Sequence, residues 1–220
     1  MTNGEILTHI DHTLLKAVAN WADIQKLCDE AMQYHTASVC VPPSYIARIH
    51  KNYPQLNICT VIGFPLGYNT TETKAAEIHS AIADGASEVD MVVNLGDVKN
   101  GEFDKITAEI AALKAAAGKH ILKVIIETCY LTQDEKVKLC GCVSDGGADY
   151  IKTSTGFGTG GATIEDIELF KANIKPSVKM KAAGGVKSRD DLEKFLAAGC
   201  ERIGTSSAVA ILNGAEAQGY

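Results

Sequence analysis

Two lysines placed in strand-like runs are the residues of this sequence with the clearest chemistry. Lys152 lies in the segment ADYIKTSTGF (148–157), and Lys181 lies in the segment VKMKAAGGV (178–186). Lysine is rarely placed inside a sheet unless it has a partner or a task. Two ammonium groups brought to one site by neighbouring strands repel each other, and this repulsion favours the neutral amine on one of them. A neutral amine is a nucleophile that attacks carbonyl carbons.

An isolated lysine needs such help, because with a pKa near 10.4 only about one molecule in 2,500 is neutral at pH 7. Asp90, in the strand-like run EVDMVVN (88–94), can balance the remaining positive charge and relay protons through water. The attacking lysine forms an imine, and the protonated imine withdraws electrons while a carbon–carbon bond breaks. These three residues therefore indicate an aldolase that works through a Schiff base.

The rest of the chain alternates short β-branched runs with helical stretches. Eight strand-then-helix units favour a parallel sheet closed into a (β/α)₈ TIM barrel, with an open doubly wound sheet as the alternative. No Gly-x-Gly-x-x-Gly fingerprint follows the first strand, and the glycines of 156–161 come too late in the chain to open a dinucleotide-binding fold. The predicted strands are residues 10–13, 37–41, 56–62, 88–93, 122–127, 150–153, 179–183 and 202–205.

Capping residues mark the ends of the predicted helices. Asn20 is suited to cap a helix from Trp21, and Ser188 is suited to cap a helix from Arg189 that ends at Gly199. Helices are likewise expected to begin at Thr70, Thr132 and Thr163. Gly85 and Gly118 are expected to end a helix before the next strand.

Alternation along the strands decides which side chains reach the barrel interior. Period-two counting places Lys152, Lys181, Asp90 and Cys40 on the interior face, near the carboxyl ends of the strands, where such barrels carry their active sites. The loops after the last three strands are rich in glycine and small polar residues, which suits phosphate binding by backbone N–H groups. A phosphorylated substrate is therefore expected at Thr155, Gly156, Gly184, Gly185, Gly204, Thr205, Ser206 and Ser207.

Composition narrows the class of protein. The 220 residues can bury one sizeable core, so we expect a single domain over residues 1–220. The formal net charge of −6 argues against a general nucleic-acid or membrane-surface binder but permits a local cationic pocket. Seven cysteines without a CxxC pair predict reduced thiols and a cytoplasmic location. Neither an export signal nor a membrane span is expected, because the chain lacks a basic-then-apolar start and any apolar run of about 18 residues.

Five other segments accompany the two lysine segments in a specific order: DHTLLK (11–16), VCVP (39–42), VIGFPLG (61–67), EVDMVVN (88–94) and KVIIET (123–128). Together, and over most of the chain, they resemble the deoxyribose-phosphate aldolase family. These class I enzymes interconvert 2-deoxy-D-ribose 5-phosphate with D-glyceraldehyde 3-phosphate and acetaldehyde, a reaction of deoxyribose phosphate breakdown.

The resemblance implies a role for each of the residues named above. It implies that Lys152 forms the imine, that Lys181 perturbs its pKa, and that Asp90 takes part in proton shuttling. It implies no metal and no cofactor, and it suggests a homodimer or a higher homo-oligomer. Family members also place Asp11 and Cys40 beside the reacting carbons, and Gly184, Gly185, Ser206 and Ser207 around the phosphate.

The sequence departs from the family pattern at Phe157, where some members carry a lysine that helps to hold the phosphate. Phosphate affinity is then expected to rest more on backbone amides and on Lys187. The chain ends in Tyr220, and in some members a C-terminal tyrosine reaches the active site and aids proton transfer.

Other interpretations of single residues stay open. A strand lysine taken alone is often a structural ion pair, and Lys123 and Lys179 also lie in predicted strands. Cys40 is expected to line the pocket as a small apolar residue without doing chemistry. Glu127 would form either an ion pair with one of the two central lysines or a wall of the pocket.

Two other functions also fit the sequence. One is another imine-forming barrel, such as a different sugar-phosphate aldolase or a transaldolase-like enzyme, which would use a different donor. The other is a non-catalytic barrel that binds sugar phosphates through the glycine and serine loops. Trapping of an imine with acetaldehyde would separate these functions.

Overall fold

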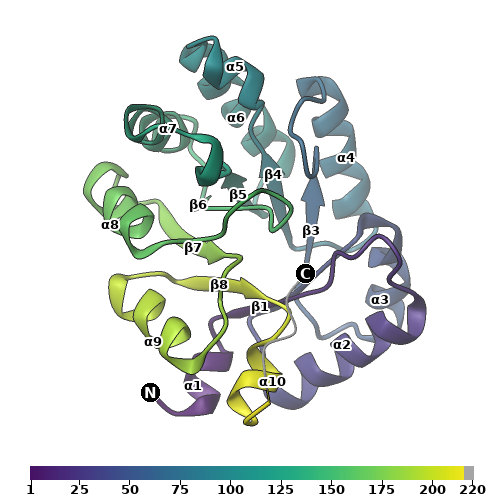
Figure 1. Ribbon diagram of the computed structural model, residues 1–220. Coiled ribbons are helices and arrows are strands. Elements are labelled where there is room, and N and C mark those ends of the chain that lie inside the picture. The colour runs from purple at the N-terminus through teal and green to yellow at the C-terminus, as the bar shows by residue number, and fades with distance from the viewer. Residues whose placement is uncertain (216–220) are drawn as a thin grey trace.

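Eight parallel strands close into a barrel in a computed structural model, which describes residues 1–215 (Figure 1). Each strand pairs with its neighbours in the chain, and β1 also pairs with β8 to close the ring. The predicted (β/α)₈ TIM barrel is confirmed. The alternative of an open sheet is wrong, because β1 pairs with β2 on one side and with β8 on the other, so the sheet has no edge strand. The strands are β1 (Ile10–Thr13), β2 (Ser38–Val41), β3 (Ile58–Ile62), β4 (Glu88–Val92), β5 (Ile121–Ile125), β6 (Tyr150–Lys152), β7 (Lys179–Ala183) and β8 (Arg202–Thr205).

Helices cover the outside of the barrel, as Figure 1 shows for α2 through α9. The long helices follow the strands in alternation, as the repeating pattern predicts. The helical elements are α1 (Asn3–Leu7), α2 (Trp21–Tyr34), η1 (Pro43–Tyr45), α3 (Ile46–Asn52), α4 (Thr71–Ala83), α5 (Leu95–Lys99), α6 (Phe103–Ala117), η2 (Thr128–Tyr130), α7 (Gln133–Asp145), α8 (Ile164–Asn173), α9 (Arg189–Ala198) and α10 (Ala208–Leu212).

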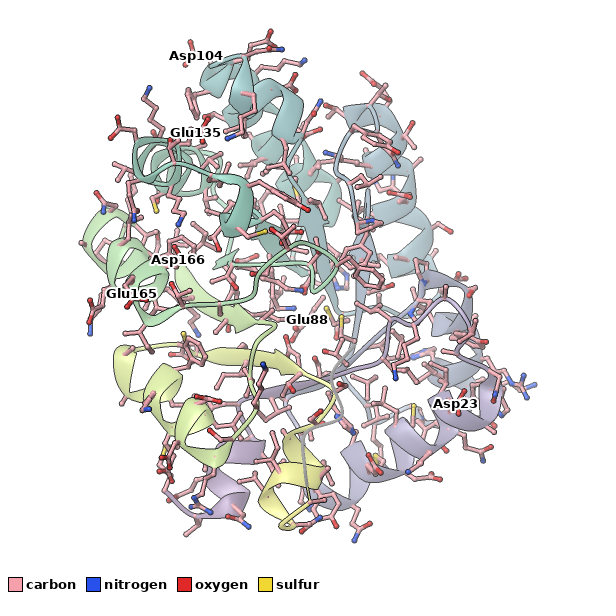
Figure 2. All side chains as sticks on the ribbon, viewed as in Figure 1. Asp23, Glu88, Asp104, Glu135, Glu165 and Asp166 are labelled. Carbon is pink, nitrogen blue, oxygen red and sulfur yellow. The ribbon has the colours of Figure 1, made fainter. Side chains whose placement is uncertain are left out.

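The predicted caps are confirmed. The side chain of Asn20 accepts hydrogen bonds from the first turn of α2, and Ser188 forms a capping box with Asp191 in α9. Thr70, Thr132 and Thr163 cap their helices in the same way. Acidic residues favour the positive ends of the helix dipoles. Figure 2 labels several of them on the outer helices, where Asp23, Asp104, Glu135, Glu165 and Asp166 lie in first turns, while Glu88 lies in the barrel.

The hydrophobic core lies between the barrel wall and the helices. Outward-facing strand residues such as Val39, Met91 and Ile203 are fully buried there. The barrel interior holds a much smaller apolar cluster of Leu15, Cys40, Cys59 and Val61, with Phe64 packed against it, and single buried apolar residues such as Val92 and Ile125. Most of the apolar burial that stabilises the fold is therefore outside the barrel, and much of the interior is occupied by polar side chains.

Several strands are shorter than predicted. β5 ends at Ile125 rather than at residue 127, because Glu127 has a φ of 53°, which is left-handed and incompatible with a strand. Within the described residues, no helix is long and apolar enough to cross a membrane.

Candidate active site

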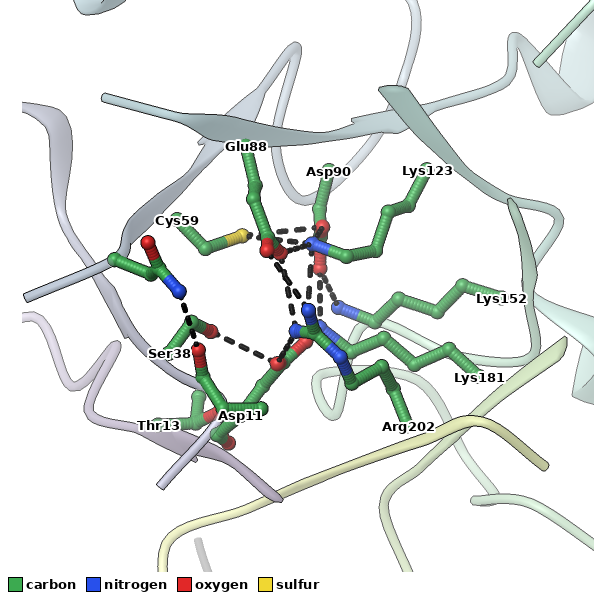
Figure 3. Close-up of polar contacts among 12 residues, drawn as sticks. Asp11, Thr13, Ser38, Cys59, Glu88, Asp90, Lys123, Lys152, Lys181 and Arg202 are labelled. Atoms are coloured by element: carbon green, nitrogen blue, oxygen red, sulfur yellow. Dashed lines mark hydrogen bonds and ion pairs between the residues drawn. The ribbon is translucent and has the colours of Figure 1, made fainter. Parts of the chain in front are cut away.

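Lys152, Lys181 and Asp90 meet inside the barrel, at the centre of the close-up in Figure 3. Lys152 and Lys181 are register partners on adjacent strands, β6 and β7. Their Nζ atoms lie 2.7 Å and 2.8 Å from the same atom, Asp90 Oδ2. Asp90 and Lys181 are fully buried, while Lys152 keeps 3% of its surface exposed. The geometry predicted from strand alternation is therefore present, although the catalytic roles of these residues stay predictions.

Further ions surround this group (Figure 3). Lys123 Nζ lies 2.9 Å from Asp90 Oδ1 and 2.6 Å from Glu88 Oε2. Arg202 donates to Glu88 Oε1 at 2.9 Å and also binds Asp11. Asp11 Oδ2 in turn lies 2.5 Å from Lys181 Nζ, which connects these ions to the central group.

The charges in this ion network do not cancel when every group is ionised. Four cations, Lys123, Lys152, Lys181 and Arg202, contact only three carboxylates, those of Asp11, Glu88 and Asp90. An uncompensated buried charge is costly. Lys152 contacts a single carboxylate, whereas Lys123 and Lys181 each contact more than one. Within residues 1–215, Lys152 is therefore the cation of this network with the fewest ion pairs.

The ion pairs outweigh burial in setting the pKa values of the central groups. Burial alone would raise the pKa of Asp90, but Lys123, Lys152 and Lys181 hold it well below its usual range. Burial alone would lower the pKa of Lys181, but Asp11 and Asp90 raise it. Lys181 is therefore held as a permanent cation beside Lys152, as its predicted role requires.

Cys40 lies fully buried in the interior, where its thiol contacts that of Cys59. The hydrogen bond from Cys59 lowers the pKa of Cys40, and burial raises the pKa of Cys59. The potential ligand atoms of Cys40, Cys59 and Asp90 lie within 4.8 Å of one another, so they form a candidate metal site. Three ammonium groups already bind Asp90, and their charge opposes a further cation. This donor set does not fit a resident metal ion.

The predicted phosphate-binding loops lie at the carboxyl ends of the strands. Gly184 and Gly185 follow β7 with φ values of 75° and 77°, which favour glycine. A Cβ on Gly161 would lie 2.5 Å from the carbonyl carbon of Gly184, so the loop after β6 packs directly on the loop after β7. The same loop after β6 carries Thr155 and Gly156. The structure therefore brings Thr155, Gly156, Gly184 and Gly185 together.

Ser206 and Ser207 lie beside a separate cavity of about 660 Å³ between α2, α10 and the loop after β1. Thr13, Lys16 and Lys26 also line this cavity, whereas Lys152, Lys181 and Asp90 do not. The charged groups of this cavity include His12, whose Nε2 lies 2.8 Å from Glu30 Oε2, but the two lysines that share Asp90 lie in the ion network instead. The two serines stay candidates for the phosphate end of the substrate.

Three remaining predictions concern the rim of the site. Phe157 is 48% exposed and packs edge-on against Phe64, with ring centroids 5.4 Å apart. Lys187 is exposed, and its backbone N–H donates to Asp191. Tyr220 lies outside the described residues.

Four members of the interior network were not predicted from the sequence as part of the site: Glu88, Lys123, Arg202 and Cys59. A usable signal was present, because Glu88 shares the face of Asp90, and Lys123 is the register partner of Asp90. Both carboxylate oxygens of Glu127 bind Thr155, and among residues 1–215 no salt bridge joins Glu127 to Lys152 or Lys181, although the charge of Lys152 still acts to lower the pKa of Glu127.

Comparison with known proteins shows the family of the chain. The model of the DeoC/LacD family aldolases matches residues 6–215. The chain is 62% identical to a deoxyribose-phosphate aldolase of Clostridium botulinum over all of both chains. It is 56% identical to the enzyme of that name from Clostridioides difficile, over 98% of this chain and 99% of the relative. A tetrameric deoxyribose phosphate aldolase from Aeropyrum pernix superposes with a TM-score of 0.86 at 30% identity, over 96% of this chain and 91% of that one.

Proposed function

The chain belongs to the DeoC/LacD aldolase family, and from that membership we propose that it is a deoxyribose-phosphate aldolase with Lys152 as its Schiff-base lysine. It would cleave 2-deoxy-D-ribose 5-phosphate to D-glyceraldehyde 3-phosphate and acetaldehyde, and catalyse the reverse addition. The names of the curated relatives support this substrate. No cofactor is needed, because the iminium withdraws the electrons.

One observation carries the proposal: two lysines from adjacent strands share one oxygen of Asp90, and of the two only Lys152 keeps any exposed surface, 3% of its area. Lys181 is held as a cation by two carboxylates, so it supplies the fixed positive charge beside Lys152 that the proposed imine mechanism requires. A neutral amine in a buried site near a fixed positive charge is an activated nucleophile for an aldehyde.

The cleavage reaction follows from these positions. Lys152 Nζ adds to the aldehyde carbon of the open sugar, and loss of water gives the protonated imine. The 3-hydroxyl loses its proton through Asp90 and a water molecule, the C2–C3 bond breaks, and its electrons move to the iminium nitrogen. Glyceraldehyde 3-phosphate leaves. The remaining enamine is protonated at carbon, and hydrolysis releases acetaldehyde and regenerates Lys152.

The phosphate of the substrate would bind at the glycine loops after β6 and β7 and at the serine pair before α10. The backbone of Gly184 and Gly185 is open to such contact because neither residue carries a side chain. Thr155 lies between this loop pair and Lys152, in a position to contact the hydroxyls of the sugar.

Reductive trapping tests the reaction class and the residue together. The protein is incubated with acetaldehyde and sodium borohydride, digested, and mapped by mass spectrometry. We expect an ethyl group on Lys152 and none on Lys123 or Lys181. An unmodified protein would favour a sugar-phosphate-binding barrel, and trapping of a ketone donor but not of acetaldehyde would favour a transaldolase-like enzyme.

A further inference from the structure

Glu127 is a buried carboxylate at the end of β5 that does not belong to the ion network. It is 3% exposed, and burial raises its pKa although the hydrogen bonds of Thr155 and the charge of Lys152 oppose the shift. Its φ of 53° is uncommon for a residue with a side chain. Strained backbone that the surrounding structure retains is concentrated at functional sites. Burial and strain together show that the fold maintains this carboxylate at a cost.

The backbone around Glu127 is bound to the strand that carries Lys152. The N–H of Ile126 donates to the carbonyl of Lys152 at 3.1 Å, and the N–H of Thr128 donates to the carbonyl of Thr153 at 2.9 Å. The left-handed turn at Glu127 lies between these two bonds. This turn directs the carboxylate of Glu127 toward Thr155.

Both oxygens of Glu127 bind Thr155. Oε1 accepts the backbone N–H at 3.1 Å, and Oε2 accepts the hydroxyl proton in a short hydrogen bond. The Thr155 oxygen then accepts the N–H of Phe157 at 3.0 Å. A threonine hydroxyl has one proton and two lone pairs. The Thr155 hydroxyl donates its proton to Glu127 Oε2, and one of its lone pairs accepts the N–H of Phe157. Its second lone pair can therefore accept a hydrogen bond from a further donor.

The loop after β6 packs tightly on Glu127. A Cβ added to Gly158 would lie 2.8 Å from Cys129 Sγ and 3.1 Å from Glu127 Oε1. At its other end this loop is bound to β7, where the N–H of Ala162 donates to the carbonyl of Ala183. The segment between Lys152 and the glycine loops is therefore fixed at Glu127 and at β7.

We propose that Glu127 is a positioning residue that fixes the Thr155 hydroxyl as an acceptor for a substrate hydroxyl beside Lys152. This inference rests on the proposed function. A neutral side chain at position 127 could accept the backbone N–H of Thr155 at a lower desolvation cost. Only a carboxylate has two terminal oxygens, so that one can accept the N–H while the other accepts the hydroxyl proton. In Glu127→Gln, one of the two terminal atoms becomes a donor, so one of the two bonds is lost: either the Thr155 hydroxyl turns its proton away from residue 127, or the Thr155 N–H loses its acceptor and the loop shifts.

The test is a double-mutant cycle between Glu127→Gln and Thr155→Val, measured on 2-deoxy-D-ribose 5-phosphate cleavage. We expect Glu127→Gln to lower kcat by about tenfold or more and to change KM by less than about threefold. In the Thr155→Val background, the same change should lower kcat by less than about twofold. Glu135→Gln is the matched control, because Glu135 caps α7 from the same connection and does not contact Thr155.

Several outcomes would overturn the inference. If the double variant lowers kcat by the product of the two single effects, the substitutions are independent, and Glu127 does not act through Thr155. A Glu127→Gln variant as active as Glu135→Gln would remove the role altogether, and a shifted acid limb without coupling would show a direct electrostatic effect on Lys152. Equal thermal unfolding temperatures of the variants and the unmodified protein exclude a loss of stability as the cause. If Glu127→Gln fails to fold, the double-mutant cycle is measured with Glu127→Asp and Thr155→Ser instead. A failure of the proposed function is distinct, because the unmodified protein would then show neither cleavage nor trapping.

Discussion

Lys152 and Lys181 bind the same oxygen atom of Asp90, at 2.7 Å and 2.8 Å, from adjacent strands of the barrel. The two lysines are not equivalent. Lys181 also binds Asp11 and is fully buried, whereas Lys152 contacts no second carboxylate within residues 1–215 and keeps a small exposed surface. One lysine is therefore a fixed cation and the other is available to a substrate, and four predictions follow from this asymmetry and from the rim of the site.

Lys152→Met should abolish cleavage without destabilising the protein. Turnover of 2-deoxy-D-ribose 5-phosphate is expected to fall by a factor on the order of 10⁴ or more, as for other removed nucleophiles. The remaining cations and carboxylates of the network would balance, so the urea midpoint should not decrease. Lys179→Met, at the exposed start of β7, is the control and should keep full activity. Normal turnover in Lys152→Met would refute the imine assignment.

Lys181→Leu also removes one positive charge from the ion network, but we expect it to change the pH dependence of the reaction. Without the Lys181 cation, the network balances only when Lys152 is protonated, so the neutral amine appears at higher pH. The acid limb of kcat/KM should therefore move upward by about one pH unit or more. Measurement from pH 5 to pH 10 checks this, with Lys179→Leu as the control. An unmoved limb would mean that Lys181 does something other than favour the neutral amine.

Acid should destabilise the protein through Asp11 and Asp90. Their pKa values are lowered in the folded protein, so the stability they contribute is present above the unfolded carboxyl pKa and is lost as pH falls, between about pH 5 and pH 1. The pKa of Lys181 is raised, so its contribution is present below about pH 10 and is lost only above it.

Urea unfolding at several acidic pH values measures this dependence. Asp90→Asn should lower stability at neutral pH and should also make the pH dependence shallower, because one of the two carboxylates no longer titrates. Asp145→Asn removes an exposed carboxylate paired with Lys175 and should leave the slope nearly unchanged. Equal slopes in the unmodified protein and Asp90→Asn would contradict the assignment.

Phe157→Lys should strengthen phosphate recognition. An ammonium group at this exposed rim position, next to the glycine loops, can approach the substrate phosphate. We expect KM for 2-deoxy-D-ribose 5-phosphate to fall about three- to tenfold, which corresponds to one ion pair, and the gain to weaken with added salt. KM for unphosphorylated 2-deoxyribose should not change, and Phe157→Leu controls for the lost contact with Phe64. An equal gain for both sugars would show that charge is not the cause.

The sequence by itself determined the order and type of the main elements. Alternating runs of β-branched residues, with caps such as Asn20 and Ser188, specify local structure, because capping and periodicity act within a few residues. The placement of Lys152, Lys181 and Asp90 on one interior face also followed from the sequence, since side chains alternate strictly along a strand. The family was recognisable from the same segments, and the family model confirms it.

Only the tertiary structure decided which ions contact one another. Asp11 meets Arg202 across the closure of β1 with β8, and Glu88 meets Lys123 and Arg202 from two other strands. Such contacts depend on the register and closure of the whole barrel, which no local pattern encodes. The left-handed turn at Glu127 is of the same kind. It is stabilised by bonds to β6 and Thr155, and nothing in the residue type of Glu127 predicts it.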